Sequence, residues 1–138
     1  MKMLLNNILK EVLNKKKTYC GVLIEKESRD MLLSRFEDKI PDGWKKIAHH
    51  MTIDPFSRMK DLDKLGKNVK LKVTEFGISD KACAVKVEGY KGKTNNKFPH
   101  VTLAINDKEG AKPKDSNDIK KWEPLNNEFF IDGTIENL

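Results

Sequence analysis

Two short phrases in this chain place the same reactive residue types at the same spacing. They are His50-Met51-Thr52-Ile53 and His100-Val101-Thr102-Leu103, and they begin with two of the three histidines in the sequence. Both phrases predict β-strands, in which alternate side chains share a face. Each strand would therefore present its His and Thr on one side and two apolar residues on the other. Two imidazoles and two hydroxyls around one small anion could carry out acid/base chemistry on a phosphodiester.

The residue types fit this chemistry because ring opening of a cyclic phosphate needs a base on one side of phosphorus and an acid on the other. An imidazole titrates near pH 6.5, so a neutral and a protonated histidine can coexist near neutrality. We expect His100 to act as the base and His50 as the acid, although the near-symmetry of the phrases gives no internal way to decide. The hydroxyls of Thr52 and Thr102 would donate to phosphate oxygens. The alternative is that both histidines are ordinary strand residues.

Composition gives weaker guidance. The 138 residues carry a net charge of +6, with 35% charged residues and a pI near 9.2, which favours a polyanionic partner such as RNA. Cys20 and Cys83 lie in apolar runs without metal-ligand spacing and predict buried thiols of a reducing compartment. No apolar run approaches the roughly 18 residues that cross a bilayer. We expect a cytoplasmic protein, of a cell or of a virus-infected host cell, with no cofactor, no metal and no membrane partner.

The pattern of apolar residues mixes helices and strands. Residues 1–16 predict an N-terminal amphipathic helix, and Ser28 is placed to cap a second helix. Residues 69–76 and 82–87 predict a hairpin, and 129–135 predict a last strand, with a third helix from Ser116 or Asn117 to Trp122. The prediction is an α+β fold, a single domain over 1–138 with mostly antiparallel sheets. The separation of the two phrases by 50 residues suggests two lobes, each with one His-x-Thr strand.

The twin phrases resemble those of the two-histidine (2H) phosphoesterase superfamily. The match is closest to the cyclic-phosphodiesterase domain of fungal tRNA ligases and to its stand-alone relatives, over roughly residues 18 to 136. Further similar text lies in 19–22, 49–52, 77–82, 99–103 and 112–117. The resemblance implies a bilobed fold of two sheets with pseudo-twofold symmetry and helices packed outside. It also implies metal-independent opening of 2′,3′-cyclic phosphate ends of RNA to a 2′-phosphate. Its two histidines map to His50 and His100, and its two threonines to Thr52 and Thr102.

Other residues are weaker candidates for substrate binding. Tyr19 or Phe98 could stack on a base, Asn96 could touch ribose, and Lys112 could steer the phosphate. A core, rim or solvated position is at least as common for such residues. His49 should point away from His50 in a regular strand, as a packed or hydrogen-bonded neighbour and not as a third catalyst.

Three other functions are compatible with the same residues. A metal-dependent hydrolase could use His49, His50, His100 and Asp54, although no HExxH motif or carboxylate cluster supports it. A non-catalytic RNA-binding module could retain the cleft. Relatives in the superfamily also cleave 2′-5′ oligonucleotides or cyclic signalling nucleotides. The partner is therefore expected to be RNA with a 2′,3′-cyclic phosphate end, or a small cyclic or 2′-5′ nucleotide.

Overall fold

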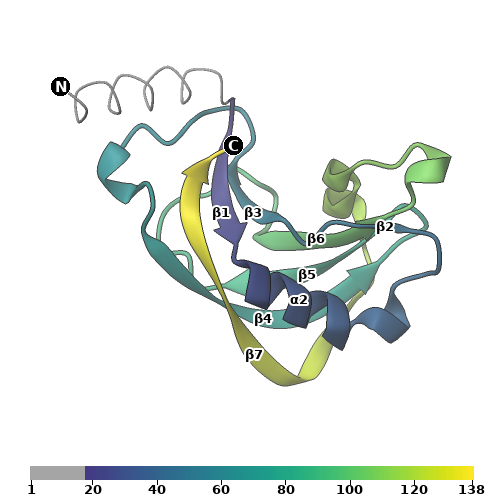
Figure 1. Ribbon diagram of the computed structural model, residues 1–138. Coiled ribbons are helices and arrows are strands. Elements are labelled where there is room, and N and C mark those ends of the chain that lie inside the picture. The colour runs from purple at the N-terminus through teal and green to yellow at the C-terminus, as the bar shows by residue number, and fades with distance from the viewer. Residues whose placement is uncertain (1–17) are drawn as a thin grey trace.

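In the computed structural model, which describes residues 18–138, the strands form one antiparallel sheet that closes on itself (Figure 1). Strands β6, β3, β1, β7, β4 and β5 are neighbours in that order, and β5 pairs back onto β6 to complete a six-stranded barrel. The short β2 pairs with the end of β6 on the same edge as β3, which follows it in the chain. The strands are β1 (Cys20–Ile24), β2 (Lys45–Lys46), β3 (His50–Asp54), β4 (Asn68–Ile78), β5 (Ala82–Glu88), β6 (His100–Ile105) and β7 (Trp122–Asn137).

The predicted α+β fold with two lobes and two sheets is therefore wrong. Only one α-helix, α2 (Lys26–Arg35), lies in the described part, with four short 3-10 helices: η1 (Glu37–Lys39), η2 (Leu62–Lys64), η3 (Asp107–Glu109) and η4 (Pro113–Asp118). The pseudo-twofold arrangement with one His-x-Thr strand per lobe is wrong too, because both strands belong to one barrel. The predicted helix over 1–16 lies outside the described residues.

The length of β7 explains why the sheet closes. Near its C-terminal end β7 pairs with β1, from Gly133 to Asn137, and along most of its length it pairs with β4. The pairing is irregular between Val73 and Glu75, where residues 125–128 of β7 lie opposite the single residue Thr74 of β4. A long, twisted strand that binds two neighbours, together with such an irregularity, curls a sheet toward closure.

The barrel is filled by alternate side chains of its own strands. Each of the six strands contributes at least one side chain with 0% exposure: Val22, Met51, Leu71, Val85, Val101 and Ile131. Helix α2 adds Leu32, and Phe36 just after it stacks on Phe76 with ring centroids 5.2 Å apart. All of these residues belong to one hydrophobic cluster.

Of three local secondary-structure predictions, one was right and two were wrong. The hairpin was right, since β4 and β5 pair antiparallel across 79–81. Ser28 is not a cap: it lies inside α2, and its hydroxyl accepts a hydrogen bond from the Asp132 N–H at 2.8 Å. The third helix was also wrong, because a 3-10 helix ends at Asp118 and Trp122 already belongs to β7. No helix of residues 18–138 is long and apolar enough to span a bilayer.

Candidate active site

The two His-x-Thr phrases lie on neighbouring strands, β3 and β6, which pair antiparallel through Met51 and Val101. Both of these residues are fully buried in the barrel. Since side chains alternate along a strand, the residues on either side of Met51 and Val101 project from the opposite face of the barrel wall. The central Met51–Val101 pair thereby brings His50 and Thr52 next to His100 and Thr102.

A bulge precedes His50. Four residues separate Lys46 from Met51, whereas only two separate their partners Val101 and Ala104. Ala48 absorbs part of this excess with a φ of 46°, a left-handed conformation that non-glycine residues rarely adopt. It remains bound to β6 through its N–H, which donates to the Thr102 carbonyl at 2.9 Å.

The bulge corrects the expected position of His49. This residue precedes β3, so the alternation of a regular strand does not apply to it. Its Nδ1 lies 2.9 Å from Nδ1 of His50, with the two rings edge to face. The prediction that His49 is a hydrogen-bonded neighbour is confirmed, but the prediction that it points away from His50 is wrong.

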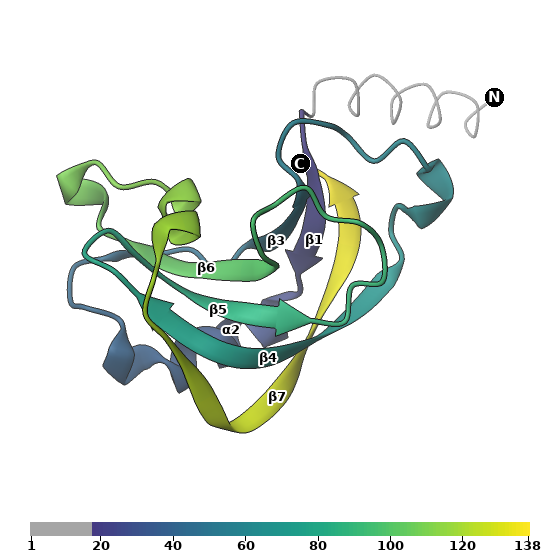
Figure 2. The same cartoon turned by 180° about the vertical axis from the view of Figure 1, so that it is seen from behind.

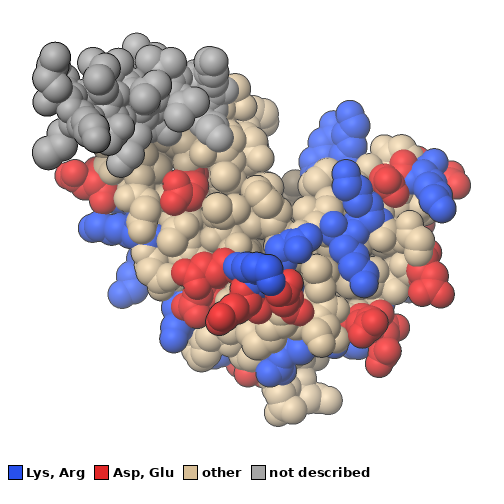
Figure 3. Space-filling model, viewed as in Figure 1, with Lys and Arg blue, Asp and Glu red and all other residues tan. Residues whose placement is uncertain are grey.

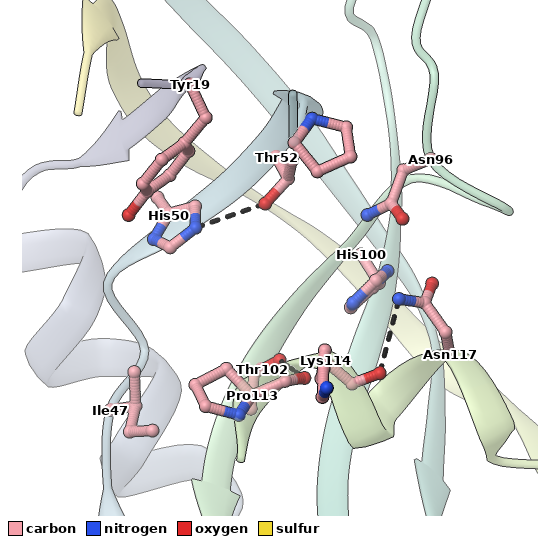
Figure 4. A pocket seen from close by; sticks show the side chains of 11 residues that line it. Tyr19, Ile47, His50, Thr52, Asn96, His100, Thr102, Pro113, Lys114 and Asn117 are labelled. Atoms are coloured by element: carbon pink, nitrogen blue, oxygen red, sulfur yellow. Dashed lines mark hydrogen bonds between the residues drawn. The ribbon is translucent and has the colours of Figure 1, made fainter. Parts of the chain in front are cut away.

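Figure 4 shows the four phrase side chains around one hollow. The pocket has a volume of about 270 Å³. It lies between β3, β6, η4 and the loop that precedes β6, and it is lined by Tyr19, Ile47, His50, Thr52, Pro55, Asn96, His100, Thr102, Pro113, Lys114 and Asn117. A hollow of this size can admit a phosphate with part of its ribose.

His100 is held by the backbone. Its Nδ1 lies 2.9 Å from the Phe98 carbonyl, which can only accept, so Nδ1 carries the proton and Nε2 is the second, reactive nitrogen. Its ring contacts the Phe98 ring at 5.1 Å between centroids, and only 6% of the residue is exposed. Burial lowers the pKa of His100, while the bond to the Phe98 carbonyl opposes this by favouring the protonated ring.

His50 has different surroundings. Its Nε2 lies 3.1 Å from the Thr52 hydroxyl, and the Tyr19 ring lies 5.6 Å away between centroids. Burial, and then the nearby charges of His49 and His100, lower the pKa of His50 to about 4. A neutral imidazole at position 50 is therefore the resting state near neutral pH.

The two threonines also differ. The Thr102 hydroxyl donates to the Pro113 carbonyl at 3.2 Å and lies 2.8 Å from the Ser116 hydroxyl, which is fully buried. These contacts tie β6 to η4, which forms one wall of the pocket. Within the described residues, the side chain of Thr52 bonds only to His50.

The weaker candidates divide into two groups. Tyr19 and Asn96 line the pocket. Phe98 lies behind His100, where it contacts the ring but not the pocket, and Lys112 also lies outside the lining. The Lys112 N–H instead donates to the Asp115 carboxylate at 2.8 Å, which fixes the start of η4.

Sequence reasoning missed Lys114 and Asn117, which line the pocket from η4. The Asn117 amide N–H donates to the Lys114 carbonyl at 3.2 Å, and its Oδ1 is buried without a hydrogen-bond partner among the described residues. The signal available was the similarity of residues 112–117 to the superfamily, which marked the segment but not the residues that face the pocket.

The metal-dependent alternative depends on His49, His50, His100 and Asp54. Across 18–138, no group of three or more His, Cys, Asp or Glu residues is arranged to hold a metal ion. Both carboxylate oxygens of Asp54 are engaged, by the Phe56 N–H at 2.9 Å and the Asn95 amide at 3.1 Å.

Comparisons with known proteins show a shared fold. No protein-family model matches the chain, and no curated protein matches it. Among solved structures it is similar to a protein described as a fungal RNA kinase, with a TM-score of 0.59 and 16% identity. The match covers 87% of this chain and 45% of that one, so this chain spans less than half the length of its structural neighbour.

Proposed function

We propose that this protein is a metal-independent phosphodiesterase that opens 2′,3′-cyclic phosphate ends of RNA to a 2′-phosphate. The observation that carries the proposal is the pairing of β3 with β6, which gathers two imidazoles and two hydroxyls around one pocket. The resemblance of the twin phrases to 2H phosphoesterases and the shared fold with a protein described as an RNA kinase support an RNA substrate.

The chemistry needs two proton transfers. A histidine removes a proton from water, whose oxygen forms a new bond to phosphorus. The bond between phosphorus and ribose O3′ breaks, and the second histidine gives its proton to O3′, which leaves the phosphate on O2′. Each transfer contributes roughly 100- to 10,000-fold in rate.

The surroundings of the rings favour His50 as the base and His100 as the acid, which reverses the assignment expected from the sequence. The pKa of His50, lowered to about 4, keeps this ring neutral and able to accept a proton. Burial lowers the pKa of His100 as well, but the Phe98 carbonyl opposes this shift, because Nδ1–H donates to it in the charged ring too. The negative charge of a bound cyclic phosphate would raise the pKa of both rings. Substrate binding would therefore be accompanied by uptake of a proton by one of the two histidines.

The hydroxyls have separate tasks in this proposal. The Thr52 hydroxyl can turn from His50 to a non-bridging phosphate oxygen and stabilise the charge that develops there. The Thr102 proton is occupied by the Pro113 carbonyl, so Thr102 acts mainly by holding η4 against the pocket. The Lys114 ammonium on η4 adds positive charge at the mouth.

The test is turnover of cytidine 2′,3′-cyclic phosphate in excess chelator, with products identified by phosphorus NMR. We expect cytidine 2′-phosphate to accumulate, and no product with the His50→Ala/His100→Ala double variant. Intact substrate from about pH 5 to pH 8, the range in which imidazoles titrate, would contradict the proposal. A panel of a 2′-5′ dinucleotide and a 3′,5′-cyclic nucleotide run in parallel identifies the bond that is cleaved if it is a different one.

A further inference from the structure

A first hollow lies close to the active-site pocket, at the end of the barrel where β3 ends. It has a volume of about 410 Å³ and lies between the segment after β3 and the loop before β6. Its basic side chains are Arg58, Lys60, Lys64 and Lys93, and all four are exposed. Asp54 is the one carboxylate in its lining, and hydrogen bonds occupy both oxygens of that group.

A second hollow continues from the first. It has a volume of about 570 Å³ and adds three exposed lysines, Lys67, Lys70 and Lys91, to the shared Lys64. The two hollows share Lys64 and Tyr90. The loop that joins β5 to β6 runs beside the segment that leads into β4 (Figure 2). Tyr90, half-buried, lines both hollows at their junction. We name the two hollows together the basic groove.

The lining of the basic groove is strongly positive, with seven basic side chains and one carboxylate, that of Asp54. Its seven basic side chains form no ion pair with any described carboxylate, since the three ion pairs of residues 18–138 involve Lys26, Lys72 and Lys86. By contrast, the face that carries α2 mixes acidic and basic side chains (Figure 3). Uncompensated cations along a trough favour a chain of phosphates.

The groove also leads to the catalytic pocket. Cys20, Asp54 and Asn95 line the first hollow, and their immediate neighbours Tyr19, Pro55 and Asn96 line the active-site pocket. No described residue lines both hollows, so a strand whose terminal phosphate lies between the two histidines would reach the groove by passing over the edge of the barrel where these neighbouring residues lie.

We propose that the basic groove binds the single-stranded RNA that leads to the cyclic phosphate end, so that an oligonucleotide is a better substrate than a free cyclic nucleotide. This inference rests on the proposed function, which supplies the 2′,3′-cyclic phosphate at the end of the RNA. The lysines and Arg58 contact successive phosphates, and the Tyr90 ring stacks on a base where the two hollows meet.

The kinetic test compares a hexaribonucleotide ending in a 2′,3′-cyclic phosphate with cytidine 2′,3′-cyclic phosphate. The groove variant is Lys64→Gln/Lys67→Gln/Lys91→Gln. Its matched control is Lys26→Gln/Lys39→Gln/Lys108→Gln, which removes the same charge outside the groove. We expect kcat/KM for the hexamer to exceed that for the nucleotide by more than about tenfold in low salt, and this ratio to fall toward one in the groove variant only. Because a single strand contributes a salt slope of about 0.7 per neutralised phosphate, the groove variant should lower the slope by about 2.

Equal turnover of hexamer and nucleotide by the wild type would overturn the groove proposal, as would equal losses in the two triple variants. If the protein opens neither substrate, the proposed function is wrong. A binding measurement then tests separately whether the groove binds RNA. Fluorescence anisotropy with a labelled hexaribonucleotide ending in a 2′-phosphate should then still show weaker binding by the groove variant than by the control. Identical affinities of the two variants would exclude the groove as an RNA site.

Discussion

The β3 side and the β6 side of the pocket begin from the same four-residue pattern and end with different chemistry. His50 follows a bulge and is backed by the exposed imidazole of His49, which can donate or accept a hydrogen bond according to its tautomer. His100 is backed by the Phe98 carbonyl, which accepts a hydrogen bond at every pH. The comparison shows that the repeated motif brings the two imidazoles together. The hydrogen-bond partner behind each imidazole decides whether that ring donates or accepts a proton.

The threonines extend this contrast. Thr52 bonds to its own histidine, while Thr102 bonds to the Pro113 carbonyl and the buried Ser116 hydroxyl. The β6 side is therefore built into the wall of the pocket, and the β3 side retains a hydroxyl that can turn to the substrate.

The largest effects should come from removing either imidazole. We expect His50→Ala and His100→Ala each to lower kcat by roughly 100- to 10,000-fold, since each loses one proton transfer. Lys112→Ala, which lies outside the pocket lining, is the control and should stay within about twofold of the wild type. If either histidine variant retained more than a tenth of the wild-type kcat, the two-histidine mechanism would be wrong.

Substitution of Thr52 should affect the catalytic rate, whereas substitution of Thr102 should affect the stability of the fold. Thr52→Val should lower kcat by roughly 100-fold, because a donor to the developing charge is lost, with little change in the free energy of unfolding. Thr102→Val should lower the free energy of unfolding by about 1–3 kcal/mol, because the buried Ser116 hydroxyl loses its partner. Urea denaturation measures this difference. Equal loss of stability in both variants would remove the distinction between the two sides.

His49 should affect the rate through the tautomer of His50. For His50 to accept a proton at Nε2, its other ring nitrogen must carry a proton, and this Nδ1–H then donates to Nδ1 of His49. We expect His49→Ala to lower kcat by roughly 10- to 100-fold, as is typical for residues that orient a reactive group. His49→Asn should restore most of the rate, because its Oδ1 accepts at a similar position.

The pH profile distinguishes this role from a structural one. The titratable or charged groups that surround His50 are His49, His100, Tyr19 and Lys114. In the wild type, the acid limb of kcat/KM should follow the pKa of His50, and because His49 helps to lower that pKa, His49→Asn and His49→Ala should each move the limb to higher pH. A profile that is the same in the wild type and in both variants would show that His49 does not control His50.

A separate effect is the pH dependence of stability. The folded pKa of His50, about 4, lies below the unfolded value near 6.5, so the unfolded chain binds more protons between these values. The free energy of unfolding is therefore full above about pH 6.5 and declines as the pH falls toward 4. His50→Gln cannot charge and should reduce this decline, as measured by urea unfolding at pH 7 and pH 5. An unchanged decline would mean that His50 is not held neutral by burial.

The sequence predicted the local features of the site well. Alternation along a strand was enough to place Met51 and Val101 inside and their His and Thr neighbours on the other face. Separate lobes were a wrong prediction because the 50-residue separation says nothing about which strands pair. Closure depends on the length of β7 and on the β5–β6 pairing, which arise from long-range contacts.

Two features of the site could not be predicted for local reasons. Ala48 adopts a left-handed conformation, which glycine or asparagine usually signals in a sequence. The bulge that turns His49 toward His50 could therefore not be predicted from the residue types. Residues 113–118 form a 3-10 helix whose position depends on the Thr102 hydroxyl, so the pocket-facing roles of Lys114 and Asn117 depend on a tertiary contact.

The central claim is that one phosphate contacts both imidazoles, and NMR of the histidine rings during a titration with cytidine 2′-phosphate tests it most directly. We predict that the resonances of His50 and His100 shift together with one dissociation constant, and that the pKa of each ring rises when the phosphate is bound. Shifts confined to one of the two rings, or two different dissociation constants, would contradict the account.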